Sequence, residues 1–134
     1  MSWSDKLSLS DRAKYGEARR LSERGDVSGY TSLLLELVDS NPDVGILHAM
    51  AANGCWDLDE HVRAAVHFSR AVQLSPTTER ISLGYFHFLL EHDLETEAEH
   101  ELRRFLKGEE SEEYRALART LGIELSDAAS GPDR

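Results

Sequence analysis

The chain has 134 residues, of which 40% are hydrophobic and 30% are charged, as in a folded helical domain and unlike a disordered chain. The formal net charge is −10, which argues against nucleic-acid binding because phosphate backbones are bound by clustered Lys and Arg. No apolar run approaches the roughly 20 residues that cross a bilayer, and the single cysteine, Cys55, cannot form an internal disulfide, so we expect a cytoplasmic domain without a membrane segment.

The first 42 residues predict a leader and two helices. Residues 1–10 form the leader, and Ser8 or Ser10 is placed to cap a helix over about residues 11–24, since a serine side chain can bond the free amides of the first turn. Gly25 ends this helix, because glycine accepts a left-handed turn. The second helix covers about residues 27–40 and has apolar residues at steps of three and four: Val27, Tyr30, Leu33, Leu34, Leu37 and Val38.

Two more helices follow in the centre of the chain. The third covers about residues 44–56. Gly54, which has no side chain, lets this helix cross a neighbouring helix closely. The fourth covers about residues 58–74 and is expected to be capped by Asp57 and Asp59. Phe68 lies on its apolar face, and Pro76 stops it because proline lacks an amide donor.

The last third of the chain predicts three helices and a tail. A helix that is capped by Thr77 or Thr78 and runs to about residue 92 is apolar on more than one face, which is typical of a helix enclosed by its neighbours. The sixth helix ends at Gly108, and Ser111 caps a last helix that ends at Gly122. Residues 123–134 are expected to be a disordered tail. No segment alternates as a strand does, so the sequence predicts an all-α fold.

The apolar pattern repeats with a period of 34 residues. Pro76 shifts onto Pro42, and Phe68 shifts onto Leu34 upstream and Leu102 downstream. This is the period of a helix-turn-helix repeat, and the chain resembles the tetratricopeptide repeat (TPR) family. The residues that carry the resemblance are Gly25, Asp26, Tyr30, Leu34, Pro42, Ala52, Ala64, Phe68, Ala71, Pro76, Leu83, Gly84, Ala98 and Leu102.

The resemblance covers about residues 11–112, and residues 111–122 resemble the extra helix that usually seals such arrays. It implies a right-handed α-solenoid of about three TPR-like helical hairpins plus a C-terminal capping helix, forming one domain over residues 11–122. It also implies a concave groove that holds an extended peptide or a partner helix, lined by the first helix of each pair. The matching groove residues are Arg12, Tyr15, Arg19, Met50, Asn53, Trp56, Arg80, Leu83 and His87. A clamp for a chaperone's terminal carboxylate is not expected, because Tyr15, Met50 and Gly84 stand where its polar residues would be.

Acidic residues gather between residues 91 and 113, where ten Asp or Glu stand against three Lys or Arg. One interpretation is a solvated helix face, and the other is an acidic surface for a basic partner. Helical spacing predicts that Glu97 and Glu101 share one exposed face and that Glu95 and Glu99 share another.

Nothing in the sequence predicts catalysis or a cofactor. No two of the six histidines are three or four residues apart, the spacing that a helical metal site needs. Cys55 lies beside Trp56 without an adjacent cation, so we expect a buried, inert thiol.

Two hypotheses about function follow, and a third, an enzyme, would need a metal or ligand that the sequence does not predict. The first is a non-enzymatic module that binds a peptide or partner protein, and analogy extends it to a bacterial immunity-type inhibitor, a secretion chaperone or an adaptor, because many toxic effectors are basic. The alternative is a structural protein in which apolar faces, above all that of the fifth helix, form a subunit interface. The chain would be a monomer in the first case and a homodimer in the second.

Overall fold

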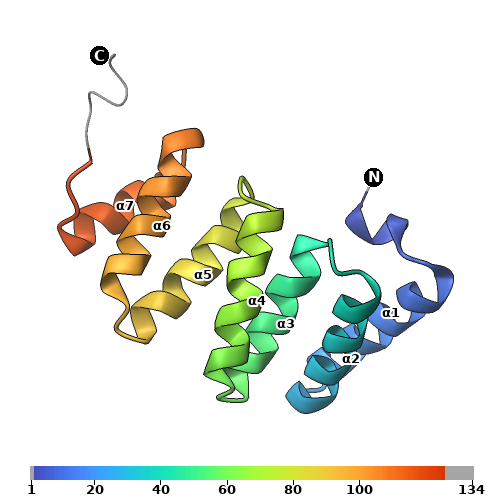
Figure 1. The fold of residues 1–134 in the computed structure, drawn as a ribbon. Coiled ribbons are helices and arrows are strands. Elements are labelled where there is room, and N and C mark those ends of the chain that lie inside the picture. Colours follow the sequence, from blue (N-terminus) through green and yellow to red (C-terminus); the bar gives the residue numbers. More distant parts are fainter. Residues whose placement is uncertain (1, 126–134) are drawn as a thin grey trace. The chain divides into compact units, whose positions relative to one another are not determined.

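The protein is all-α, as its sequence predicts. A computed structural model describes residues 2–125, and within that range there is no strand (Figure 1). In the same range, no helix has both the length and the apolar character to cross a membrane. The predicted tail falls mainly on residues 126–134, outside the described residues. The helices are α1 (Leu9–Glu23), α2 (Val27–Ser40), α3 (Gly45–Asp57), α4 (His61–Leu74), α5 (Glu79–Glu91), α6 (Glu95–Gly108) and α7 (Glu112–Leu121), preceded by a short 3-10 helix, η1 (Trp3–Lys6).

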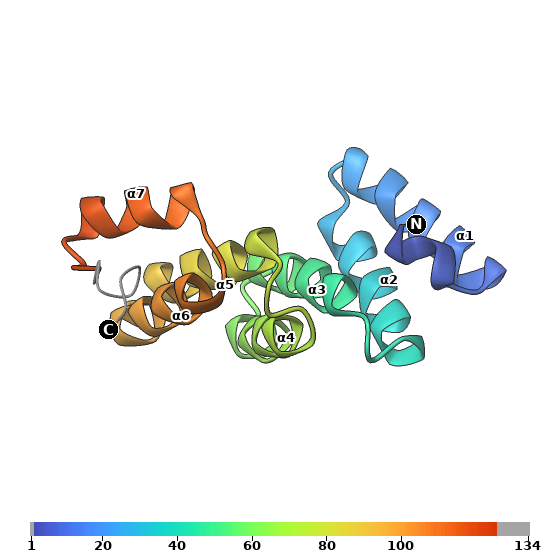
Figure 2. The same cartoon turned by 90° about the horizontal axis from the view of Figure 1, so that it is seen from above.

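The chain divides into two compact units, Met1–Pro76 (unit 1) and Thr77–Arg134 (unit 2). In unit 1 each helix packs against the next, and Figures 1 and 2 show α1 beside α2 and α3 beside α4. In unit 2, α5 packs against α6 and α6 contacts α7. Short turns join the helices within each unit, so helices that follow one another in the sequence of a unit are also neighbours in space.

Helix positions along the chain repeat at the predicted period. The even-numbered helices α2, α4 and α6 begin at Val27, His61 and Glu95, at intervals of 34 residues. The interval between the starts of α3 and α5, at Gly45 and Glu79, is the same. The 34-residue pattern of apolar residues therefore corresponds to a repeat of helix boundaries.

The turns after α1, α3 and α5 also repeat. Each contains one residue in the left-handed region, Gly25 (φ 79°), Asp59 (φ 62°) or Asp93 (φ 59°). The next amide in each turn bonds the carbonyl five residues back, as when the Glu60 amide donates to the Cys55 carbonyl oxygen at 2.8 Å. Asp59 thus belongs to the end of α3, and its prediction as a cap of α4 is wrong, as is that of Asp57, the last residue of α3. The N-cap of α4 is Glu60, whose side chain makes no capping bond.

Two predicted serine caps and one predicted close approach are confirmed. The Ser8 hydroxyl accepts a hydrogen bond from the Asp11 amide at 3.0 Å, and the Ser111 hydroxyl accepts one from the Tyr114 amide at 3.1 Å. At Gly54 of α3, an added Cβ would lie 2.2 Å from the Thr31 hydroxyl oxygen of α2. Only glycine permits this distance between the two helices.

The leader packs onto unit 1. Leu7 is buried in the core that α1, α2 and α3 share, and Trp3 packs against the same core. Leu9, in contrast, is 78% exposed at the start of α1. The other buried residues of this core are Ala18, Leu34, Leu37, Val38, Leu47 and Ala51.

In unit 2, α7 is held by Tyr114. Its side chain is fully buried, with its ring edge-on to Phe86 of α5 at 5.3 Å and tilted against Phe105 of α6 at 5.5 Å between centroids. Such aromatic pairs add to the free energy of burial. One residue of α7 thereby contacts both preceding helices.

Candidate partner-binding surface

Unit 1 contains a cavity of about 220 Å³ between α1, α2 and α3, which we call the α1–α3 cavity. Most of its wall comes from one side of α1, since side chains three and four residues apart lie on the same face of a helix. Tyr30 of α2 and Met50 of α3 complete the wall. The lining residues are Tyr15, Arg19, Ser22, Glu23, Tyr30 and Met50.

The leader and two polar contacts position α1 beside this cavity. The ring of Trp3 lies edge-on to that of Tyr15, with centroids 5.0 Å apart. Lys14 forms an ion pair of 3.0 Å with Glu36 of α2. Beyond the end of α2, the side-chain amide of Asn41 donates to Asp11 at 3.0 Å and to the Leu37 carbonyl oxygen at 2.9 Å. The ring of Tyr15 thus contacts the leader, and Lys14 and Asp11 tie α1 to α2 and the turn that follows it.

The environment of the Tyr30 phenol is partly dehydrated. Burial raises the pKa of Tyr30 above its ordinary value, and Tyr15 and the Asp57 carboxylate act in the same direction. Tyr30 therefore stays neutral at physiological pH and can both donate and accept a hydrogen bond.

Three of the predicted groove residues meet at this cavity. Tyr15 and Arg19 come from α1 and Met50 comes from α3, which are the helices that the TPR resemblance assigns to the groove. The cavity wall also contains Tyr30, Ser22 and Glu23, which were not predicted as groove residues. The only sequence feature that places Ser22 and Glu23 there is their helical spacing from Tyr15 and Arg19.

The other groove candidates of unit 1 do not line the cavity. Arg12 and Asn53 are exposed on α1 and α3. Trp56 is half-buried, with its ring edge-on to Phe68 of α4 at 6.0 Å between centroids. Trp56 thus contributes to the packing of α3 on α4.

The remaining groove candidates lie on α5 in unit 2. Arg80 is exposed, and Leu83 and His87 are half-buried. The imidazole of His87 lies edge-on to Phe86, with centroids 5.5 Å apart.

The predicted acidic surface on α6 is only partly present. Glu95 and Glu97 are exposed, and Glu99 is half-buried and forms an ion pair of 2.8 Å with Arg103. Glu101 is 4% exposed, so the prediction that it shares an exposed face with Glu97 is wrong. The prediction assumed that residues four apart on a helix are equally exposed. Glu101, however, lies toward α5 and α7 and is covered by them.

Glu101 belongs to a buried polar network across all three helices of unit 2. The Ser82 hydroxyl of α5 donates to Glu101 at 2.6 Å, and Arg104 binds both carboxylate oxygens, at 2.8 and 2.6 Å. Since Ser82 has one proton, the Tyr114 hydroxyl must be the donor in its 2.7 Å bond to Ser82. Burial raises the pKa of Tyr114 well above its ordinary value, so this donor keeps its proton.

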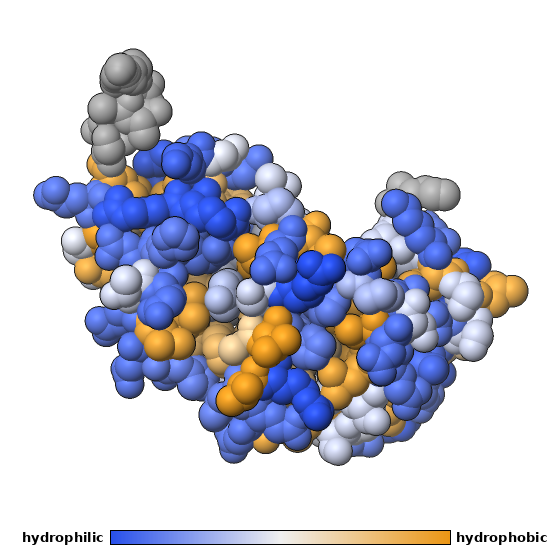
Figure 3. Space-filling view, viewed as in Figure 1, coloured by the Kyte–Doolittle hydropathy of each residue, from blue (hydrophilic) through white to orange (hydrophobic). Residues whose placement is uncertain are grey.

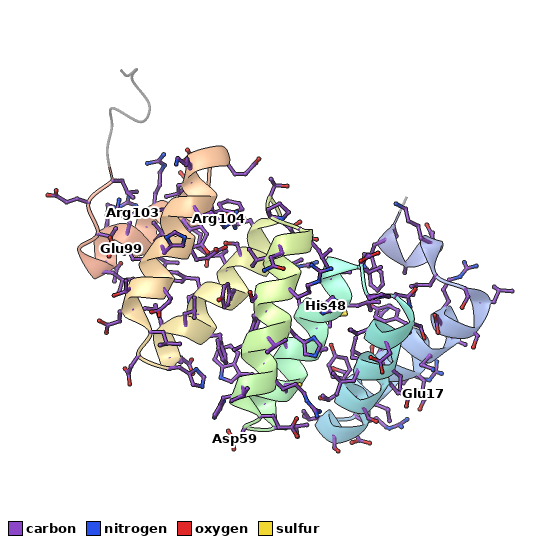
Figure 4. All side chains as sticks on the ribbon, in the orientation of Figure 1. Glu17, His48, Asp59, Glu99, Arg103 and Arg104 are labelled. Atoms are coloured by element: carbon purple, nitrogen blue, oxygen red, sulfur yellow. The ribbon has the colours of Figure 1, made fainter. Side chains whose placement is uncertain are left out.

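A second polar contact that sequence spacing does not predict joins α3 to α4. His48 and His67 are 19 residues apart, yet their Nδ1 atoms lie 3.1 Å apart. His48 Nε2 bonds the Pro42 carbonyl oxygen at 2.9 Å and must carry a proton, so in a neutral His48 the Nδ1 atom is unprotonated and accepts from the Nδ1–H of His67. The His48 side chain extends from α3 (Figure 4). No group of three or more potential metal ligands is found within residues 2–125.

Unit 1 also contains a buried thiol and exposed apolar side chains. Cys55 is buried as expected, and burial raises the pKa of its thiol, with Glu60 acting in the same direction. Apolar surface lies over α4 among hydrophilic residues (Figure 3). Val62 and Val66 of α4 are 82% and 61% exposed, whereas no large apolar residue of α5 is among the exposed ones.

Comparison with known proteins adds no family or relative: no family model matches the chain, and neither does any curated protein.

Proposed function

We propose that this protein is a non-enzymatic, TPR-like module that binds a peptide segment of a partner protein in the α1–α3 cavity. The observation that carries this proposal is that Tyr15, Arg19 and Met50, from two different helices, line a single cavity. These residue types are enriched at protein interfaces, and Tyr and Arg are frequent binding hot spots.

The size and chemistry of the cavity suit one anchoring side chain. Small-molecule pockets usually measure about 300–1,000 Å³, and this cavity has about 220 Å³. Tyr15, Tyr30 and Met50 offer contact to an apolar side chain, while Arg19 and Glu23 can bond the polar backbone of a peptide. Met adapts its shape to different partners.

The charge of α6 favours a basic partner. Glu95 and Glu97 are exposed and, unlike Glu99, form no ion pair among the described residues. Such charges chiefly raise the association rate, and salt screens them within about 8 Å at physiological ionic strength. The negative charge of α6 would attract a basic partner whether the protein acts as an inhibitor, a chaperone or an adaptor.

The test is a peptide selection followed by variants matched in charge. Peptides are selected from a random display library on the wild-type protein, and their Kd is measured for Arg19→Glu, Met50→Ala and Arg20→Glu. Arg19 and Arg20 are both exposed neighbours on α1, but only Arg19 lines the cavity. We expect Arg19→Glu and Met50→Ala to raise Kd about tenfold, and Arg20→Glu to change it less than about twofold. Equal effects of the two arginine changes would exclude this cavity as the binding site.

The same peptides test the role of the acidic surface. Glu95→Lys combined with Glu97→Lys should slow association several-fold at about 50 mM salt and much less at about 500 mM, with little change in dissociation. Unchanged association rates would mean that Glu95 and Glu97 only form a solvated helix face and do not contribute to partner binding.

Exposed apolar residues on α4 support a second candidate, self-association. Val62 and Val66 lie four residues apart on one side of the helix and are largely exposed. Light scattering after size exclusion tests this: Val62→Asp with Val66→Asp should convert a dimer to a monomer, and a monomeric wild-type protein would rule this candidate out. The fifth helix, which the sequence suggested for such an interface, has no exposed large apolar residue.

A further inference from the structure

Unit 2 contains a second and larger cavity, of about 440 Å³, between α6, α7 and the segment that follows α7. We call it the α6–α7 cavity. Residues 77–134 hold seven Lys or Arg against fourteen Asp or Glu, yet four of those seven cations line this one cavity. Its lining residues are His100, Arg103, Arg104, Leu106, Lys107, Arg115 and Leu125.

Helical spacing explains why the cations converge. His100, Arg103, Arg104 and Lys107 lie at steps of three, one and three along α6, which places them on one side of the helix. The buried apolar residues of α6, Leu102 and Phe105 among them, occupy the opposite side. Arg115 of α7 completes the cationic wall from the opposite helix.

Three carboxylates hold the arginines in place. Arg103 uses its Nε and Nη2 atoms to bond Glu99 (Figure 4), Arg104 uses the same two atoms to bond Glu101, and Arg115 does so with Glu110. An arginine has five N–H donors, so one carboxylate does not exhaust its bonding capacity. Lys107 forms no ion pair within the described part of the chain.

The charge and the shape of the cavity together indicate its ligand. Four permanent cations against three paired carboxylates leave one uncompensated positive charge, that of Lys107. Leu106, Leu125 and the methylene stems of the basic residues supply apolar wall. A volume of about 440 Å³ lies in the usual range for small organic ligands.

We propose that the α6–α7 cavity binds a small organic monoanion, a carboxylate with an apolar body, whose charged group pairs with Lys107. A charge-assisted bond to an ammonium group is roughly twice as strong as a neutral one, which would orient the ligand. The site lies in unit 2 and the proposed peptide site in unit 1, so either proposal can fail without the other.

Calorimetric titration of the full chain with three probes tests this proposal. Octanoate has the charge and the apolar body, octan-1-ol has the body alone, and acetate has the charge alone. We expect octanoate to bind at least about fivefold more tightly than octan-1-ol, and acetate to show no binding. Equal affinity for octanoate and octan-1-ol, or no binding of octanoate at millimolar concentration, would overturn the proposal.

Matched variants assign the charge to its residue. Lys107→Gln should weaken octanoate binding about fivefold and leave octan-1-ol unaffected, while Lys107→Arg should restore most of the affinity. The control is Arg63→Gln, which removes one positive charge at an exposed position of α4. It tests the effect of net charge alone and should change the affinity for octanoate less than about twofold. If Lys107→Gln and Arg63→Gln act alike, Lys107 does not pair with the ligand and the proposal is wrong.

Discussion

The Ser82 hydroxyl of α5 donates a 2.6 Å hydrogen bond to the buried Glu101 carboxylate of α6. This bond joins two helices through a charged acceptor, and Tyr114 of α7 donates to the same hydroxyl. Hydrogen bonds to charged groups contribute more than neutral ones, and a buried partner left unpaired adds a desolvation cost.

Ser82→Ala should therefore destabilise the protein by about 2 kcal/mol. The variant removes the donor to Glu101 and leaves the Tyr114 hydroxyl without its acceptor. Urea unfolding followed by circular dichroism measures the change in the free energy of unfolding. Ser32→Ala, at an exposed position of α2, is the control and should stay within about 0.5 kcal/mol of the wild type. A similar small effect of Ser82→Ala would mean that the network adds little to stability.

Phe68→Ala should destabilise the protein by about 3–5 kcal/mol, the usual cost of truncating a buried aromatic side chain. Phe68 is 1% exposed and contacts the edge of Trp56. Val66→Ala, two residues away and 61% exposed, controls for helix propensity. Thermal and urea unfolding give the comparison. An effect of Phe68→Ala under about 1 kcal/mol would contradict its place in the core of unit 1.

The His48–His67 contact predicts a pH dependence of stability. Burial lowers the pKa of His67 below its ordinary value of 6.5, His48 and Arg63 act in the same direction, and Asp39 opposes them. Below about pH 6.5 the unfolded chain then binds more protons than the folded one at this residue, so stability falls as pH falls through this range.

His67→Gln should reduce this loss, since glutamine can donate to His48 without titrating. The measurement is the difference in unfolding free energy between about pH 7.5 and 5.5. His61→Gln, at an exposed position of α4, is the control and should retain the wild-type slope. A wild-type slope in His67→Gln as well would assign the loss to other groups.

The repeated left-handed turns predict two substitutions of opposite sign. Asp93→Gly should stabilise the protein by up to about 1 kcal/mol, because an L-residue at φ 59° is strained and glycine is not. Gly25→Ala should destabilise it by about 1 kcal/mol for the converse reason, since an added Cβ meets no atom within 4 Å and only the backbone strain remains. Urea midpoints measure both. A destabilising Asp93→Gly would show that the Asp93 side chain compensates for the strain.

The candidate site was predictable in part. The TPR resemblance selects Tyr15, Arg19 and Met50 as groove residues, and all three line one cavity. The same reasoning places Trp56 in the groove, and its half-buried ring lies against Phe68 and does not line this cavity. Residue spacing indicates the side of a helix, but the crossing of α3 and α4 decides what that side contacts.

The helices and their 34-residue period could be predicted from the amino-acid sequence alone. Apolar steps of three and four, the breaks at Pro42 and Pro76 and the 34-residue recurrence are local signals, and the helix boundaries follow them. The contacts between polar residues, in contrast, depend on how the helices pack. Glu101 bonds a serine 19 residues away and His48 bonds a histidine 19 residues away, each on another helix. Such pairs depend on the rotation and crossing of two packed helices, which side-chain packing decides and no short stretch of sequence encodes.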